Sequence, residues 1–232
     1  MCDATTNAGV LRVAAPGARW LSTGWDGGYV AADAAYNVSV PEGWDRTDLS
    51  AYAAERRADA GFETSGPTLL TGVDMTHVRG ARSGSVTAYA TAGVSNPAVL
   101  PMDGDADAEA PETRNADAGT VNVVVGTSRA LDDAGLATLL SVAVEAKTAT
   151  LLAETGFPGT TTDAVVTGTD PDGEPATFAG SGTDVGAAAR ACVRDAVRAS
   201  LRSRYAERDL PASVDAAEHG VVTSRDAEVF CV

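Results

Sequence analysis

The stretch Thr120-Val121-Asn122-Val123-Val124-Val125 decides the fold, because its short apolar run predicts a buried β-strand. Residues 132–154 follow with the apolar spacing of a long helix, and residues 163–167 predict a second strand. Residues 184–205 have the pattern of another long helix. A strand–helix–strand unit followed by a helix is typical of a mixed sheet covered by helices. We therefore expect an α+β, or mixed α/β, fold in which mixed β-sheets pack against two long helices of the C-terminal half.

The N-terminal half has a more meander-like pattern of short β-rich runs. The elements predicted there are strands at residues 10–14, 29–40, 68–73 and 85–92, a turn at 25–28, and a helix at 45–60 capped by Asp45 or Thr47. A length of 232 residues fits one well-filled core. We expect a single domain over residues 1–232, with an acidic solvated loop at about 101–118 and a polar C-terminal tail from about residue 206.

The charge balance is strongly acidic, with 32 acidic and 17 basic residues and a net charge of −15. Lys147 is the only lysine, so nearly all of the basic residues are arginine. Dense surface carboxylates with few lysines are typical of adaptation to high salt, which screens their mutual repulsion. Such a surface repels nucleic acid, because it cannot replace the counterions of phosphates. We therefore expect a halophilic protein without a nucleic-acid partner.

No apolar run approaches the roughly 20 residues that span a bilayer. Residues 1–7 lack the basic and apolar regions of a secretory signal. The expected location is therefore the cytoplasm, away from the membrane. Cys2, Cys192 and Cys231 have neither disulfide nor metal-ligand spacing, and Cys192 is predicted to be buried.

The helix predicted at residues 132–154 carries Lys147 in the middle of its apolar face, while Glu145 points to the opposite side. A buried ammonium group is costly unless it is paired and hydrogen-bonded. Lys147 has two interpretations: it reaches the helix edge or makes a structural ion pair, or it is a functional group.

The second long helix carries arginines at intervals of four, which are Arg190, Arg194, Arg198 and Arg202. This spacing predicts a solvated face whose arginines pair with neighbouring acids. The alternatives are a contact in a homo-oligomer or a seat for acidic groups of a substrate.

Four segments, in this order, resemble the adenosylcobinamide amidohydrolase family. They are Leu21-Ser22-Thr23-Gly24-Trp25-Asp26-Gly27-Gly28 with Asn37-Val38-Ser39-Val40; Ala92-Gly93-Val94-Ser95-Asn96; Gly119-Thr120-Val121-Asn122-Val123-Val124-Val125 with Glu145-Ala146-Lys147-Thr148-Ala149; and Gly159-Thr160-Thr161-Thr162-Asp163-Ala164-Val165-Val166 with Ala179-Gly180-Ser181-Gly182-Thr183. Asp26 stands where the family is expected to carry Asn, and Gly182 and Asp184 stand where some relatives carry His and Lys.

The resemblance implies a hydrolase that acts on a linear amide bond. Its substrate would be adenosylcobinamide and its products adenosylcobyric acid and aminopropanol, a reaction that salvages cobinamide for cobalamin biosynthesis. The alternatives are a non-catalytic corrinoid-binding protein and an amidase acting on another substrate.

Amide hydrolysis needs a nucleophile, a group that stabilises the oxyanion, and a proton for the leaving amine. In a metal-free mechanism Lys147 is expected as a base or as the cation facing the oxyanion. Asp163 or Glu145 is expected to activate water, and Asn122 to donate to the oxyanion or to the substrate amide. The residues expected to bind the substrate are Asp26, Gly27, Gly28, Asn37, Asn96, Thr161 and Thr162. Asn122 and Thr161 have an alternative as ordinary hydrogen-bonding residues of a strand and a turn.

Familiar amidase motifs are absent from the sequence, which has neither G-x-S-x-G nor H-E-x-x-H. A zinc site built from Asp26, Asp74 and His77 is an alternative on ligand type, but no ligand spacing marks it. We therefore expect no cofactor and assign no metal ligand, and the metal requirement stays open. The tryptophans, Trp20, Trp25 and Trp44, are candidates for an apolar platform under the corrin ring or for core residues.

Overall fold

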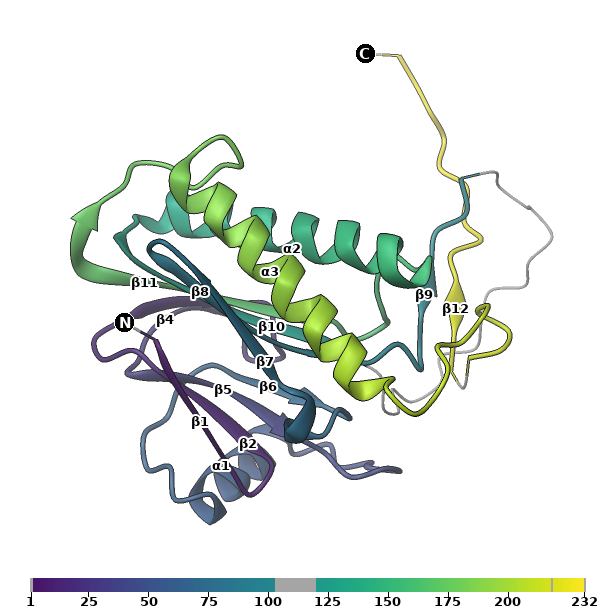
Figure 1. The fold of residues 1–232 in the computed structure, drawn as a ribbon, viewed down its shortest axis with the longest axis horizontal. Helices are drawn as coiled ribbons and strands as arrows, with labels where there is room; N and C mark the ends of the chain where they lie inside the picture. Colours follow the sequence, from purple (N-terminus) through teal and green to yellow (C-terminus); the bar gives the residue numbers. More distant parts are fainter. Residues whose placement is uncertain (1, 103–119, 218, 232) are drawn as a thin grey trace.

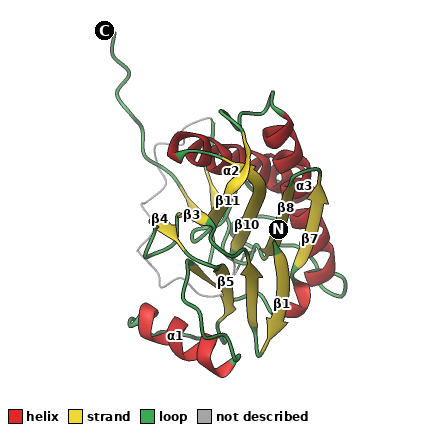
Figure 2. Cartoon of the chain, turned by 90° about the vertical axis from the view of Figure 1, so that its left-hand side faces the viewer, coloured by secondary structure: helices red, strands yellow, loops and turns green. Residues whose placement is uncertain are grey.

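The computed structural model describes residues 2–102, 120–217 and 219–231 (Figure 1). The acidic loop expected at about 101–118 lies outside these residues, apart from its first two positions. The described part is built in layers: two long helices, a six-stranded sheet, a four-stranded sheet and one shorter helix (Figures 1 and 2). This arrangement confirms the expected α+β class with mixed sheets.

The six-stranded sheet has the order β4-β3-β11-β10-β8-β7. Its strands are β3 (Arg19–Ser22), β4 (Gly28–Ala31), β7 (Arg79–Ser83), β8 (Val86–Ala92), β10 (Val121–Ala130) and β11 (Ala164–Pro175). Only the central pair, β10 and β11, runs parallel, and the other neighbours are antiparallel. The apolar stretch that opens β10 is therefore the centre of the fold.

The four-stranded sheet has the order β1-β2-β5-β6. Its strands are β1 (Asp3–Asn7), β2 (Val10–Ala14), β5 (Ala34–Ser39) and β6 (Thr68–Thr71). A small parallel pair joins β9 (Ala98–Val99) to β12 (Val221–Val222). The tail expected from about residue 206 thus returns to the folded body.

The long helices α2 (Asp133–Thr155) and α3 (Asp184–Arg204) cover one face of the six-stranded sheet, as Figure 1 shows. Each begins at a side-chain cap: Asp132 accepts from Gly135 N at 2.7 Å, and Thr183 accepts from Gly186 N at 3.1 Å. The helix α1 (Leu49–Asp59) packs on the far side of the four-stranded sheet, and a 3-10 turn, η1 (Met75–His77), precedes β7.

Three apolar layers hold these elements together. Side chains alternate along each strand, so Val123 and Val125 of β10 face the long helices while Val124 faces the other sheet. The layer between the sheets includes Trp20, whose ring lies across Gly168: a Cβ there would come within 2.4 Å of the indole. Trp20 is fully buried and therefore belongs to the core rather than to a platform for a ligand.

The helix α2 is the one described helix that is long and apolar enough to cross a membrane by length and composition. Buried residues make up 44% of its most apolar window. Its inner face packs in the core through Leu136, Leu139, Ala143 and Leu151. The helix thus serves as a core element of this fold.

Several details differ from the sequence-based expectations. The strand expected at 29–40 is two strands, β4 and β5. The strands β1, β3, β7, β9 and β12 were not expected. The first helix begins later than predicted, after Asp48, whose carboxylate is held by Arg46 at 2.8 Å instead of capping the helix. The strand β11 continues through residues 170–173, where a turn was expected, with a register shift against β10.

Candidate functional site

Parts of the four motif segments meet at one end of the central strands of the six-stranded sheet, here called the motif edge. Residues 179–183 of the fourth segment lie elsewhere, before α3 and beyond the other end of β10, where Ala176 N donates to Ala130 O. The end of β8 pairs with the start of β10, as Ala92 lies opposite Val121. The start of β11 runs beside it, and Ser22 at the end of β3 lies opposite Val166. Segments that are far apart in the sequence therefore present their ends side by side.

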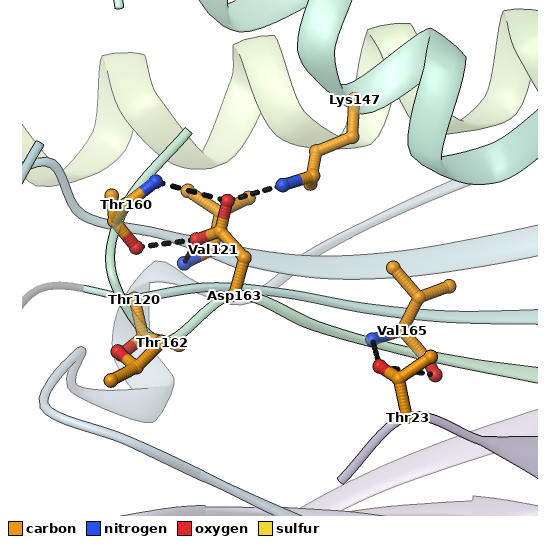
Figure 3. A network of polar contacts seen from close by, with 8 residues as sticks. All are labelled: Thr23, Thr120, Val121, Lys147, Thr160, Thr162, Asp163 and Val165. Carbon is orange, nitrogen blue, oxygen red and sulfur yellow. Dashed lines mark hydrogen bonds and ion pairs between the residues drawn. The ribbon is translucent and has the colours of Figure 1, made fainter. Parts of the chain in front are cut away.

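A buried ion pair lies at the centre of this edge (Figure 3). Lys147 Nζ of α2 donates to Asp163 Oδ2, and the side chains are 7% and 10% exposed. Asp163 also accepts from Val121 N at 2.9 Å, from Thr160 N at 3.1 Å and from Thr160 Oγ1. Each carboxylate oxygen of Asp163 therefore accepts two hydrogen bonds. These bonds attach the turn that precedes β11 to both α2 and β10.

Thr161 and Thr162 of that turn are exposed residues, and their hydroxyls are hydrogen-bonded to buried neighbours. Thr162 Oγ1 is 2.7 Å from Thr120 Oγ1, and Thr161 Oγ1 accepts from Asn96 Nδ2 at 2.6 Å. Asn96 is buried, and its Oδ1 has no partner within the described chain. The structure therefore brings Asn96, Thr161, Thr162, Asp163 and Lys147 together.

Asn37 and Asn122 form a separate polar link between the two sheets. Asn122 Nδ2 donates to Asn37 Oδ1 at 2.9 Å and to Leu70 O at 2.8 Å, and Asn37 Nδ2 donates to Thr91 Oγ1 at 2.9 Å. Both asparagines are about 1–2% exposed. With both amide hydrogens engaged, Asn122 is placed as a structural link rather than as an oxyanion donor.

The hairpin between β3 and β4 places Asp26, Gly27 and Gly28 in exposed positions at the same edge. Gly27 has no room for a side chain, because a Cβ would lie 2.6 Å from Ser22 O. Gly28 has a φ of +106°, which favours glycine. Trp25 in this hairpin is 39% exposed and remains available to a ligand.

Glu145 lies apart from the cluster, as its opposite orientation on the helix predicts. Its carboxylate accepts from Arg190 at 3.2 Å on the outer surface of α2 and α3. Arg194 and Arg198 pair with Asp195 and Glu154 in the same region. The arginine stripe is thus a solvated face that pairs with acids, and Glu145 belongs to it.

A cavity of about 640 Å³ opens beside the cluster, between η1, the segment after β8 and the end of α3. Its lining includes Asp74, His77, Ser95, Arg204 and Arg208. Residues 209–212, 216 and 217 of the C-terminal tail form another wall. The cavity and the motif cluster share the segment Gly93–Asn96, because Ser95 lines the cavity and Asn96 binds Thr161.

The pKa values of two ionisable side chains in the cavity, His77 and Asp74, are shifted from their usual values. Burial lowers the pKa of His77, and the positive charge of Arg204 lowers it further, against the opposing effect of Asp74. Hydrogen bonds from Thr76 lower the pKa of Asp74. Asp74 is therefore a carboxylate at neutral pH, and His77 is held toward its neutral form.

Within the described ranges, no three His, Cys, Asp or Glu side chains come together as a metal-binding group. The zinc alternative built from Asp26, Asp74 and His77 therefore has no support in the geometry. Cys2 and Cys192 are buried free thiols and Cys231 is exposed.

Comparisons with known proteins agree with the motif cluster. The adenosylcobinamide amidohydrolase family matches residues 2–209. An adenosylcobinamide amidohydrolase from Halobacterium salinarum is 56% identical over 232 residues, which cover 99% of each chain. The chain belongs to the adenosylcobinamide amidohydrolase family. The match confirms the resemblance found in the sequence, and the Halobacterium relative is consistent with a halophilic protein.

A second adenosylcobinamide amidohydrolase, from Methanosarcina mazei, is 30% identical over 195 residues, covering 79% of this chain and 90% of that one. A crystal structure of a protein from Pyrococcus horikoshii has a TM-score of 0.44 and 11% identity, covering 86% of this chain and 78% of the other.

For this member of the adenosylcobinamide amidohydrolase family, sequence reasoning missed the cavity and two of its residues. Ser95 was part of a recognised motif but had no role assigned. Arg204 gave no signal, because it lies two residues beyond the regular arginine stripe. The sequence suggested a role for Asp74 and His77 only as zinc ligands.

Proposed function

We propose that this protein hydrolyses the amide bond of adenosylcobinamide and releases adenosylcobyric acid and aminopropanol. The corrinoid is the substrate, and the reaction serves cobinamide salvage in the cytoplasm. The observation that carries the proposal is that parts of all four motif segments meet at the motif edge, in a chain that is 56% identical to an adenosylcobinamide amidohydrolase over 99% of its length.

The edge offers hydrogen-bonding groups suited to a corrinoid, whose flat ring is fringed with amides. The exposed residues Thr161 and Thr162, and the Asp26–Gly28 hairpin with Trp25, are the groups proposed to contact it. A ring of this size rests on the surface of the protein, because the cavity of about 640 Å³ fits only a drug-sized group.

In this proposal Lys147 and Asp163 hold the substrate-binding turn in place through their ion pair. Asp163 already accepts four hydrogen bonds, so it activates no water in this arrangement. Asn37 and Asn122 fix the spacing of the two sheets behind the turn. Glu145 has no part in the site.

The test is an assay of the purified protein in molar salt with adenosylcobinamide, with separation of products by chromatography. We expect formation of adenosylcobyric acid and aminopropanol in equal amounts. Simple amides assayed in parallel separate a corrinoid-specific enzyme from a general amidase.

The corrinoid-binding alternative has one observation in its favour: Asp26, Gly182 and Asp184 depart from the residues expected in the family. Tight corrinoid binding by a folded protein without turnover would support that alternative and refute the hydrolase. Turnover restored or raised by Asp26→Asn would show that the departure only tunes the activity.

A further inference from the structure

The cavity beside the motif cluster contains an arginine, Arg204, that makes no direct ion pair within the described residues, although the cavity is also lined by the carboxylates of Glu42, Asp74 and Asp209. Arg204 lines the cavity, and its Nε is buried without a hydrogen-bond partner. No ion pair to Arg204 is formed within residues 2–102, 120–217 and 219–231, although the chain has 32 acidic residues. A guanidinium group in such a position is suited to an oxyanion of a ligand.

The motif glycine Gly93 is what allows Arg204 to take this position. A Cβ at Gly93 would lie 2.9 Å from Arg204 Nε and 3.0 Å from Val73 Cγ2. The hydroxyl of Tyr205 accepts from Val94 N at 2.9 Å and fastens the same segment to the end of α3. The Gly93–Ser95 segment and Arg204 thus form one wall of the cavity.

His77 stands on another side of the cavity, in a defined orientation. Its Nδ1 is 3.1 Å from Ser203 Oγ, and that oxygen also accepts from Arg79 at 2.6 Å. In the tautomer in which Nδ1 donates to Ser203, Nε2 is left as an acceptor. The depressed pKa described above keeps the imidazole in the neutral form that accepts a proton.

We infer that this cavity receives the scissile amide, with Arg204 facing its carbonyl oxygen and His77 accepting the proton of the attacking water. The inference deepens the proposed function and rests on it. The corrin ring stays at the motif edge, and the side arm that ends in aminopropanol enters the cavity past Ser95.

Water forms a C–O bond to the amide carbon, its proton passes to His77 Nε2, and the carbonyl oxygen becomes an oxyanion beside Arg204. The C–N bond then breaks, and His77 returns the proton to the leaving nitrogen. The second proton of the water passes from the new carboxylic acid to the amine, so the products are a carboxylate, which stays beside Arg204, and aminopropanol in its ammonium form.

The experiment compares Arg204→Met and His77→Gln with Arg202→Met, which removes an exposed arginine outside the cavity on the same helix. We expect kcat to fall by about 100-fold or more in the first two variants, the scale of losing an oxyanion donor or a general base, with a small change in KM. Arg202→Met is expected to keep the wild-type rate. Near-normal kcat in a folded Arg204→Met or His77→Gln protein overturns the inference.

A binding measurement separates this inference from the proposed function and from misfolding. Adenosylcobyric acid, the carboxylate product, is titrated into wild type, Arg204→Met and Arg202→Met, with circular dichroism as the check of folding. We expect its affinity to fall about 10-fold or more in Arg204→Met only, while the affinity for adenosylcobinamide changes little. This readout holds even if the wild-type protein shows no turnover. Equal losses for both ligands, or no loss, overturn the role of Arg204.

Discussion

Lys147 in α2 and Asp163 immediately before β11 form a buried ion pair, so a single contact ties a long helix to the entry of the parallel strand pair. The pair explains why a lysine occupies the apolar face of α2 in a chain that otherwise uses arginine. The ion pair packs closely against Gly159: a Cβ at this position would come within 2.8 Å of Asp163 Oδ2 and 3.5 Å of Lys147 Nζ. The compact ammonium group of a lysine fits this space better than the wider guanidinium group of an arginine.

Replacing Lys147 by Met is expected to lower the free energy of unfolding by about 3–5 kcal/mol, because the Asp163 carboxylate is left buried without its counter-charge. KM for the corrinoid is expected to rise as the Thr161–Thr162 turn loosens. Denaturant unfolding and steady-state assays in molar salt measure the two effects. A stable variant with a 100-fold lower kcat would instead make Lys147 a catalytic group.

The control for this prediction is Arg190→Met, which breaks an exposed ion pair with Glu145. It is expected to cost less than about 1 kcal/mol. The double variant Lys147→Met/Asp163→Asn is expected to be more stable than Lys147→Met, because no charge remains buried. A double variant as unstable as the sum of its parts would contradict the ion-pair explanation.

Asn122→Ala is expected to destabilise the protein by about 1–3 kcal/mol, because Asn37 Oδ1 and Leu70 O lose their donor between the sheets. Turnover per folded molecule should stay near wild type. Asn7→Ala is the matched control, since Asn7 makes a single bond to Ala60 O at 3.0 Å from an exposed position. A large loss of kcat with unchanged stability would return Asn122 to the catalytic role that its motif suggested.

The sequence predicts the direction of a side chain on a helix but not its partner in the folded protein. Helical periodicity correctly placed Lys147 on the inner face and Glu145 on the outer face, because one helix determines both directions. It left the partner of Lys147 open, since Asp163 is 16 residues away and meets it only after β10 and β11 pair. The contact between Asn37 and Asn122 could not be predicted for a similar reason: it joins two sheets whose packing no local pattern encodes.

The cavity illustrates the same limit more strongly. Its walls come from η1, the segment after β8, the end of α3 and the C-terminal tail, which are brought together only by the tertiary fold. The tail was expected to be merely polar, because single-sequence patterns give no sign that residues 221–222 pair with β9. The long helices and β10 were predictable because their patterns are local and repeated.

The acidic surface leads to a prediction about salt. At a net charge of −15, lowering the ionic strength lengthens the range of repulsion between carboxylates, from about 3 Å at 1 M to about 30 Å at 0.01 M. We expect the melting temperature to fall, and structure to be lost, between molar salt and dilute buffer. Circular dichroism with temperature ramps measures this. An unchanged melting temperature across the series would contradict salt adaptation.

The last prediction concerns the ionisation of His77. Burial and the charges of Arg204, Arg79 and Arg208 lower its pKa below the usual 6.5, and Asp74 acts in the opposite direction. Because the folded state disfavours the protonated form, this group reduces stability as pH falls below about 6.5, where the unfolded chain binds the proton more readily. The chain has two histidines, so NMR titration of their ring protons resolves His77 from His219. Arg204→Met is expected to raise the pKa of His77 and Asp74→Asn to lower it, whereas Arg202→Met leaves it unchanged. If the pKa of His77 is the same in wild type, Arg204→Met and Asp74→Asn, the three side chains do not share the cavity in solution.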